Sequence, residues 1–273
     1  MPFEHAVGSA KRIAVIGGGI SGMGAAYALS TTSRVTLFEE APRLGGHAHT
    51  VMAGVRGDQP VDMGFIVFNY ANYPLLGHLF DQLDVPVAKS NMSFAVSVNG
   101  GGFEYALNDL NGLLGQRRNI FRPKFARMMR DLVRFNARAR EGISDPELTI
   151  GDLLADLGTG DWFRDYYILP FSGAIWSTPT QKVLDFPAQS MVQFFENHAL
   201  LSATGQHQWY TVEGGSQEYV TRLTAALTGS GVSIRTNAGV RGVRRYPNRV
   251  EVRAADGTLE YFCLLYTSDA ADE

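Results

Sequence analysis

A strand, a glycine-rich turn and a helix follow one another near the start of this chain, and this unit constrains the fold more than any other feature. Ile13–Ile16 is an apolar run, and Gly17, Gly19 and Gly22 follow it in the spacing Gly-x-Gly-x-x-Gly. The first glycine permits a tight turn, the second lets a pyrophosphate approach the backbone, and the third lets helix and strand pack closely. The pattern therefore predicts a phosphate-binding turn that opens a helix over Ile20–Ser30.

An acidic residue after the next strand indicates a dinucleotide. Arg34–Phe38 is predicted to be the second strand, and Glu39 ends it. A carboxylate at this position accepts hydrogen bonds from the adenosine ribose hydroxyls, and its charge disfavours the additional phosphate of NADP. At the start of the helix, free N–H groups favour a negative charge. We therefore expect Gly18, Ile20 and Ser21 to bind the cofactor together with the three fingerprint glycines.

A second glycine doublet favours FAD over NAD. It lies in the segment Arg43-Leu44-Gly45-Gly46, directly after the acidic residue. An NAD site does not need this doublet. FAD is longer, and further close approaches of the backbone help to hold its ribityl chain and isoalloxazine ring. The sequence therefore predicts an FAD site that includes Gly45 and Gly46.

A secretory signal peptide is the alternative interpretation of the first glycine-rich segment. Lys11 and Arg12 precede it, and Ala26-Tyr27-Ala28 resembles a cleavage site. However, the segment has too many glycines for the apolar region of a signal peptide. The position of Glu39 would also be a coincidence. We therefore keep the dinucleotide-binding interpretation.

Composition limits the class of protein. The chain has 273 residues, of which 45% are hydrophobic, and a formal net charge of −3. These values permit one large domain or two with a sizeable core, and they give no reason to expect nucleic acid as a partner. The single cysteine, Cys263, cannot form an internal disulfide, so we expect a cytoplasmic location. His47 and His49 lack two further ligands, so no metal site is predicted.

The remaining patterns predict an α/β protein in which a Rossmann-like domain is interrupted by an insertion. We expect residues 1–90 to form the first part of the FAD-binding domain, 91–208 a β-plus-helical substrate or cap domain, and 209–262 the second part. The predicted helices outside the first unit are Tyr73–Leu83 with Asn72 as its cap, Arg122–Arg140, Ile150–Leu157 capped by Thr149, Trp162–Ile175, Ala188–His198 and Ser216–Leu227. The predicted strands are Thr50–Val55, Gln59–Asp62, Met92–Val98, Phe103–Leu107, Trp209–Val212, Val232–Arg235, Val240–Tyr246, Arg249–Ala254 and Thr258–Phe262.

The final segment, 263–273, is expected to be foreign. Its sequence CLLYTSDAADE matches, in one reading frame, the translation of a transposase-based sequencing adapter. We therefore expect the natural sequence to stop near Phe262 and the chain to be a gene fragment with an incomplete second part. Such segments are excluded from reasoning about the fold.

Together these motifs resemble the superfamily of flavin-containing amine oxidases, protoporphyrinogen oxidases and phytoene desaturases. The resemblance covers Arg12–Phe262 and is most specific to a bacterial subgroup of NAD/FAD-binding oxidoreductases. The subgroup pattern is carried by GGHAHTV, VDMGFIVFN, AIWSTP, LDFPA and VEGGSQEYV. The resemblance implies an FAD domain of the glutathione-reductase type. In that domain Arg43, Gly45 and Gly46 contact the pyrophosphate and ribityl side, and Val240 contacts adenine through its backbone.

The resemblance also implies an FAD-dependent oxidoreductase. The flavin performs the difficult step, so no catalytic acid or base is predicted. Tyr70 and Trp176 are candidates for lining the pocket, with ordinary core packing as the alternative, and His198 is expected to be a cation at a helix end. We favour oxidation or desaturation of a hydrophobic small molecule such as a fatty acyl chain. The alternatives are a flavin amine oxidase, and a catalytically silent fragment or flavin-binding accessory protein.

One basic segment is not explained by these motifs. Arg117–Arg140 contains nine Arg or Lys residues and a single acid, Asp131. It could form an amphipathic helix on an anionic membrane, which would suit a lipid substrate. The interpretation that we favour is a helix of the cap domain with a solvated basic face. Nucleic-acid binding is not expected, because stacking platforms are not evident. The interleaved apolar residues are Phe121, Phe125, Met128, Met129, Leu132, Val133 and Phe135.

Overall fold

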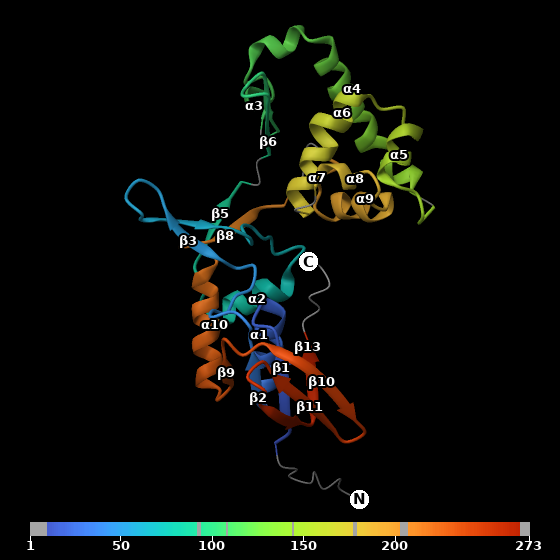
Figure 1. Ribbon diagram of the computed structural model, residues 1–273. Coiled ribbons are helices and arrows are strands. Elements are labelled where there is room, and N and C mark those ends of the chain that lie inside the picture. The colour runs from blue at the N-terminus through green and yellow to red at the C-terminus, as the bar shows by residue number, and fades with distance from the viewer. Residues whose placement is uncertain are drawn as a thin grey trace, which may run out of the picture. The chain divides into compact units, whose positions relative to one another are not determined.

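The chain divides into two compact units. The computed structural model describes residues 10–91, 94–107, 109–143, 145–176, 179–202 and 207–267. Unit 1 comprises Met1–Ser90 together with Tyr210–Glu273, and unit 2 comprises Asn91–Trp209 (Figure 1). The first unit is therefore discontinuous in sequence, and the second is inserted between its two parts.

A four-stranded parallel sheet forms the centre of unit 1. Its order is β13-β1-β2-β9. Strands β1 and β2 read as nearly continuous apolar runs because layers cover both faces of the sheet. Parallel strands in this order, with crossover connections, form the Rossmann-like architecture expected from the sequence. The strands are β1 (Arg12–Ile16), β2 (Arg34–Phe38), β9 (Ser233–Arg235) and β13 (Leu264–Thr267).

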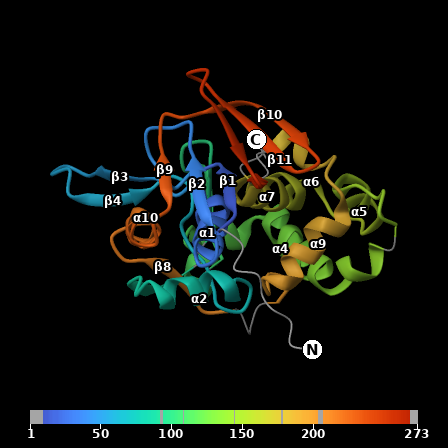
Figure 2. The ribbon, with the colours of Figure 1, turned by 90° about the horizontal axis from the view of Figure 1, so that it is seen from below.

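Helices cover one face of this sheet. Helices α1 (Ile20–Ser30) and α10 (Gln217–Gly229) lie side by side on it, and both are seen nearly end-on in Figure 2. Met23 of α1 and Leu223 of α10 are fully buried in one cluster with Leu37 of β2. This face therefore holds the main apolar core of unit 1.

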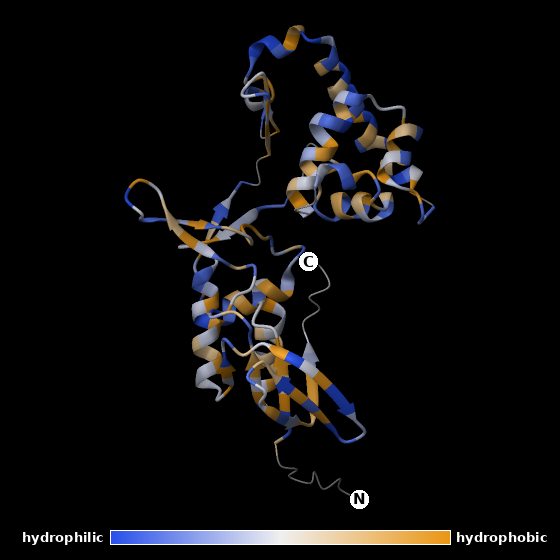
Figure 3. Cartoon of the chain, viewed as in Figure 1, coloured by the Kyte–Doolittle hydropathy of each residue, from blue (hydrophilic) through white to orange (hydrophobic). Residues whose placement is uncertain are grey.

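An antiparallel meander covers the opposite face. Ala14 of β1 and Phe38 of β2 point toward it and form a cluster with Val252 and Phe262. Because successive residues of a strand point to opposite faces, the same strands supply both cores. Figure 3 shows the corresponding alternation of hydrophobic and hydrophilic residues along the meander. Its strands are β10 (Val240–Tyr246), β11 (Arg249–Ala254) and β12 (Leu259–Phe262).

The smaller elements of unit 1 follow the predicted boundaries except for the strand at Val87–Ser90, which was not predicted, and one helix cap needs correction. Asn72 does not cap the helix that follows it. The N-cap residue is Tyr73, whose side chain does not cap the helix, and the backbone N–H of Asn72 donates to Asn69 Oδ1 at 2.7 Å. These elements are β3 (Thr50–Ala53), β4 (Gln59–Asp62), α2 (Pro74–Gln82), β5 (Val87–Ser90) and β8 (Trp209–Val212).

The exclusion of residues 263–273 from the fold was wrong for four of them. Leu264–Thr267 forms β13, which pairs in parallel with β1, and Cys263 N–H donates to Arg12 O at 2.8 Å. Backbone pairing makes few demands on side chains. The apolar run that follows β12 can therefore hydrogen-bond the backbone groups at the edge of β1, whatever the origin of the segment. Residues 268–273 lie outside the described part of the chain.

Unit 2 has its own aromatic core. Phe135, Phe163 and Phe195 are fully buried and lie in one cluster with the aromatic residues of a short hairpin. The predicted strand from Met92 begins at Ala95, and residues 92 and 93 lie outside the described chain. The elements are β6 (Ala95–Val98), β7 (Phe103–Ala106), α3 (Leu110–Leu113), η1 (Arg117–Phe121), α4 (Pro123–Arg138), η2 (Ala139–Gly142), α5 (Ile150–Asp156), α6 (Asp161–Phe163), η3 (Arg164–Ile168), α7 (Leu169–Trp176), α8 (Thr180–Val183) and α9 (Ala188–Asn197).

The core of unit 2 gives a direct stability prediction. Replacing Phe163 with Ala should lower the free energy of unfolding by about 3–5 kcal/mol, because it leaves a cavity at a fully buried site. Phe121→Ala is the matched control, because that ring is 85% exposed. Its effect should stay within about 0.5 kcal/mol. Urea denaturation followed by circular dichroism measures both changes, and equal effects would contradict the assigned core.

Candidate dinucleotide-binding site

The glycine-rich turn joins β1 to α1 through very close contacts. Gly17 has a φ of +100°, and its N–H donates to Phe38 O at 2.8 Å, which fixes the turn against β2. A Cβ on Gly22 would lie 1.9 Å from Gly17 O. The helix therefore packs directly on the turn. Around Gly19 there is more space, since the nearest atom to an added Cβ is Gly46 Cα at 4.0 Å.

The start of α1 is suited to a phosphate group. Its N-cap residue is Gly19, which provides no side-chain cap, and the first turn contains no acidic residue. Ile20 and Ser21 are exposed. An 11-residue helix that starts in this way presents unsatisfied N–H groups and the positive end of its dipole. This arrangement fits the pyrophosphate of a dinucleotide.

Glu39 is held at the edge of the same turn. Its carboxylate accepts from Gly18 N–H at 2.5 Å and from Ala41 N–H at 2.7 Å. A carboxylate has about four acceptor sites, so two remain for ribose hydroxyls. Gly18 itself is buried, and its N–H is used by Glu39. Gly18 therefore positions the Glu39 carboxylate, whereas the exposed residues Ile20 and Ser21 are accessible to a ligand.

The second glycine doublet docks on the first turn. Gly45 N–H donates to Gly18 O at 2.8 Å, and Gly19 and Gly45 form a parallel bridge. A Cβ on Gly46, whose φ is +55°, would lie 3.1 Å from Gly19 Cα. The two glycine segments therefore form one continuous backbone surface next to the start of α1.

Arg43 folds over its own turn. Its guanidinium donates to the carbonyls of Leu44 at 3.4 Å, Gly46 at 3.0 Å and Ala48 at 3.2 Å. A guanidinium carries five N–H donors, so capacity remains for a phosphate oxygen. In the structure Arg43 thus supports the second doublet, and it lies where the resemblance places a contact to the cofactor.

Val240 is brought to the ribose carboxylate by backbone pairing. Asn237 N–H donates to Ala41 O at 3.0 Å, and Ala238 N–H donates to Glu39 O at 2.8 Å. Val240 then begins β10 at a register irregularity against β11. Such irregularities leave backbone groups outside the regular ladder. The segment that leads to Val240, the residue predicted to contact adenine, therefore pairs with the backbone of Glu39, although the two are far apart in sequence.

Sequence reasoning missed a polar cluster that connects two of the quoted motifs. The Asp62 carboxylate accepts from Ser216 N–H at 2.9 Å, from Ser216 Oγ at 2.7 Å and from Thr50 Oγ1 at 2.6 Å. Thr50 Oγ1 in turn accepts from Gln217 N–H at 3.0 Å. A Cβ on Gly215 would lie 2.5 Å from Thr50. Two sequence features could have indicated this cluster. They are Asp62, the acid of VDMGFIVFN, and the Gly-Gly-Ser segment that precedes the helix predicted from Ser216.

The aromatic candidates for the pocket lie in different units. In unit 1, Tyr70 is 38% exposed and its ring centroid is 5.1 Å from that of Tyr210. In unit 2, Trp176 packs on Phe194 at 5.3 Å, while Ser177 and Thr178 of the same motif lie outside the described residues. His198 ends α9, is 8% exposed and stacks on Phe194 at 4.0 Å. Trp176 and His198 thus pack within unit 2, and of the three only Tyr70 belongs to the unit that contains the glycine-rich segments.

Comparison with known proteins defines the class. The chain belongs to the flavin containing amine oxidoreductase family, whose model matches residues 20–270. The flavin of this family agrees with the FAD predicted from the sequence. A sequence comparison with curated proteins gave no match.

Solved structures show the same fold. Wild-type putrescine oxidase bound to putrescine is similar with a TM-score of 0.66 at 18% identity, over 94% of this chain and 57% of that one. A protein from Exiguobacterium sp. 255-15, assigned as a protoporphyrinogen oxidase, gives a TM-score of 0.63 at 18% identity, over 95% and 59%. An oxidoreductase from Methanosarcina mazei gives 0.62 at 18% identity, over 94% and 58%. The chain therefore spans less than two thirds of each of these proteins.

The close contact at the turn predicts opposite effects for two glycines of α1. Gly22→Ala should lower the free energy of unfolding by about 1–3 kcal/mol and abolish FAD uptake, because its Cβ would clash with Gly17 O. Gly24→Ala should raise stability by about 0.5–1 kcal/mol, because no atom lies within 4 Å of the added Cβ. Thermal denaturation and FAD titration measure both. A loss at position 24 comparable to that at position 22 would contradict the geometry.

The ribose carboxylate gives a second prediction. Glu39→Gln removes the charge and places an amide donor beside the N–H groups of Gly18 and Ala41, so the affinity for FAD should fall at least about tenfold. Glu40→Gln is the matched control, because its carboxylate binds Arg241 at the surface. Titration with FAD, followed by quenching of flavin fluorescence, measures the affinities. An unchanged affinity of Glu39→Gln would remove this residue from the site.

Proposed function

We propose that this chain supplies the dinucleotide-binding part of an FAD-dependent oxidoreductase. The observation that carries the proposal is the convergence of four separate segments beside the uncapped start of α1. In this arrangement the helix start binds the pyrophosphate, and Glu39 binds the ribose. The backbone at Val240 meets adenine, and the doublet Gly45-Gly46 supports the ribityl side.

The chemistry is a two-electron oxidation. When bound, FAD would supply the acceptor for a hydride from the substrate, and the second hydrogen of the substrate would leave as a proton to water. The residues of the chain bind, orient and exclude water. Hydride transfer of this kind does not need a protein acid or base, and we assign none.

A hydrophobic substrate is supported by the surface that follows the Asp62 cluster. Met63 is 65% exposed and Ile66 is 58% exposed, directly after the carboxylate that holds the start of α10. Large apolar side chains exposed next to a cofactor site are typical of a surface that binds an apolar ligand. We therefore propose a fatty acyl or another lipid chain as the substrate class.

An amine is the second candidate substrate. The family is described as amine oxidoreductase, and putrescine oxidase shares the fold. Such an enzyme would release an imine that hydrolyses to an aldehyde. A third candidate, a silent fragment or a flavin-binding accessory protein, is supported by the share of the relatives that the chain covers, which is 57% for putrescine oxidase.

Flavin spectroscopy of the purified chain separates these candidates. We expect the chain to take up FAD and to show flavin absorbance, because the four binding segments are in place. Under anaerobic conditions, fatty acyl substrates should bleach this absorbance and amines such as putrescine should not.

Each other outcome selects another candidate. Bleaching by amines, with hydrogen peroxide and aldehyde formed in air, would favour the amine oxidase. Retained FAD without bleaching by either class would favour the accessory protein. Failure to take up FAD would favour the silent fragment and contradict FAD binding by this chain, and the Gly24→Ala variant would then show whether more helix stability restores uptake.

A further inference from the structure

Two large apolar residues protrude from the short turn before α4. Ile120 is 54% exposed and Phe121 is 85% exposed at the end of η1. The turn is anchored by the buried Asn119, whose amide donates to Glu104 O at 2.9 Å. The two side chains are therefore held outward by a fixed backbone. Figure 3 shows this stretch as a hydrophobic band between hydrophilic neighbours.

Unpaired basic residues surround this apolar tip. Within the described part of the chain, none of the five nearest bases forms an ion pair with a carboxylate. Two of them donate instead to backbone carbonyls: Arg118 to Gly101 O and Arg122 to Gly102 O, both at 3.1 Å. Their charge is thus uncompensated, although the protein carries a formal net charge of −3. The five bases are Arg117, Arg118, Arg122, Lys124 and Arg127.

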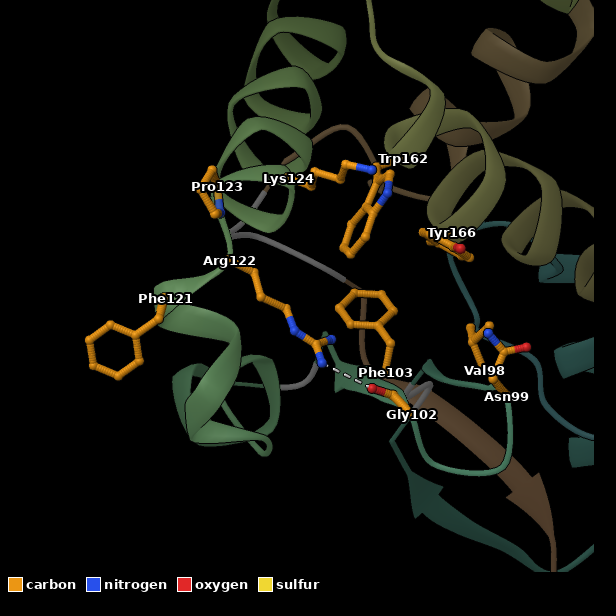
Figure 4. A pocket seen from close by; sticks show the side chains of 10 residues that line it. All are labelled: Val98, Asn99, Gly102, Phe103, Phe121, Arg122, Pro123, Lys124, Trp162 and Tyr166. Carbon is orange, nitrogen blue, oxygen red and sulfur yellow. Dashed lines mark hydrogen bonds between the residues drawn. The ribbon is translucent and has the colours of Figure 1, made fainter.

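A pocket with aromatic walls lies beside the tip. It has a volume of about 650 Å³ and is lined by Phe103, Trp162 and Tyr166 together with Lys124. Lys124 Nζ lies 5.9 Å from the centre of the Trp162 ring. Figure 4 shows Lys124 reaching toward Trp162, whereas the ring of Phe121 points away from the pocket. Trp and Tyr side chains with adjacent bases are typical of residues at a membrane–water interface.

The structure shows which apolar residues of the basic segment Arg117–Arg140 are exposed and which are buried. Phe125, Met128 and Phe135 of α4 are buried in the core of unit 2. The apolar side of this helix is therefore not available to lipid, and an amphipathic helix lying on a membrane is wrong for α4. The turn η1 instead exposes the adjacent pair Ile120 and Phe121. Among the described residues, no helix has the length and hydropathy to cross a bilayer.

We propose that η1 and its five basic residues form a docking surface for membranes that contain anionic phospholipids. Ile120 and Phe121 insert among the headgroups, while the bases contact the lipid phosphates and carboxylates. Charge complementarity and the protruding apolar pair together favour a lipid surface. A nucleic acid would leave both apolar side chains in water, and the ring of Trp162 is already engaged by Tyr166 at 5.0 Å. The proposal does not depend on FAD.

Sedimentation of the full chain with lipid vesicles tests this surface. We expect binding to vesicles of phosphatidylcholine with phosphatidylserine, and no binding to phosphatidylcholine alone. Binding should weaken as the salt concentration rises, because the screening length falls from about 10 Å at 0.1 M to about 3 Å at 1 M. Arg117→Ser with Lys124→Ser should lower the partition coefficient about 25-fold, at about fivefold for each base. Phe121→Ser should lower it about tenfold.

Matched variants in unit 1 serve as controls. Arg245→Ser with Arg253→Ser makes the same change of charge at exposed positions of the meander. Val55→Ser removes an equally exposed apolar side chain from the β3–β4 hairpin. Neither should change binding by more than about twofold. Equal losses in the controls would mean that only the total charge matters, and they would overturn the proposal.

A second measurement locates the contact by tryptophan fluorescence and leaves the basic and apolar residues of the surface unchanged. Brominated phosphatidylserine in the vesicles should quench the tryptophan fluorescence of the wild-type chain, because Trp162 lines the pocket beside η1. This quenching should decrease in Trp162→Phe, whereas Trp176→Phe should retain it. Binding to zwitterionic vesicles as strong as to anionic ones, or the absence of quenching at Trp162, would overturn the assignment. So would binding to RNA that exceeds binding to vesicles and is insensitive to Phe121→Ser.

Discussion

The backbone of Gly18 is the point on which the candidate site depends. Its N–H donates to the Glu39 carboxylate, and its carbonyl accepts from Gly45 N–H. The two backbone polar groups of one residue thus hold Glu39 on one side and the second glycine doublet on the other. A Cβ here would displace the Leu44 and Glu39 side chains, because it would lie 2.6 Å from Leu44 Cδ2 and 2.8 Å from Glu39 Oε2. The close approach therefore follows from the absence of a side chain.

The layers around the parallel sheet explain how distant segments reach this point. Each of the strands β1 and β2 supplies alternate side chains to a helical face and to a meander face. Both faces must be covered for such apolar strands to be stable. The meander can cover its face only if the chain returns after unit 2, and this return brings Val240 beside Glu39. The discontinuity of unit 1 is therefore a condition of its binding site.

Patterns that depend on neighbouring residues were predictable. The helices α1 and α10 and the strand β2 begin and end within two residues of the expected positions, and Thr149 caps α5 as expected, because glycine spacing, apolar periodicity and cap residues act locally. The strand β5 was missed, because its partner β8 lies far away in the sequence. The cap of α2 was wrong for a local reason, since the backbone of Asn72 bonds Asn69 and Tyr73 takes the cap position. The Asp62 cluster was missed for the same reason as β5, since Ser216 and Thr50 meet only in the folded unit.

The sequence by itself determined the dinucleotide-binding turn, the order of the elements and the family. Each of these depends on short motifs whose residues interact with close neighbours in the chain. Only the tertiary structure decided what those parts contact. In the folded unit, Gly18 N–H donates to the Glu39 carboxylate, and the Arg43 guanidinium donates to a carbonyl of its own turn. Leu264–Thr267 pairs in parallel with β1. The tertiary structure also separated the buried apolar face of α4 from the exposed apolar tip of η1. The reason is that burial and hydrogen-bond partners are properties of the packed chain, and periodicity records only which residues share a face.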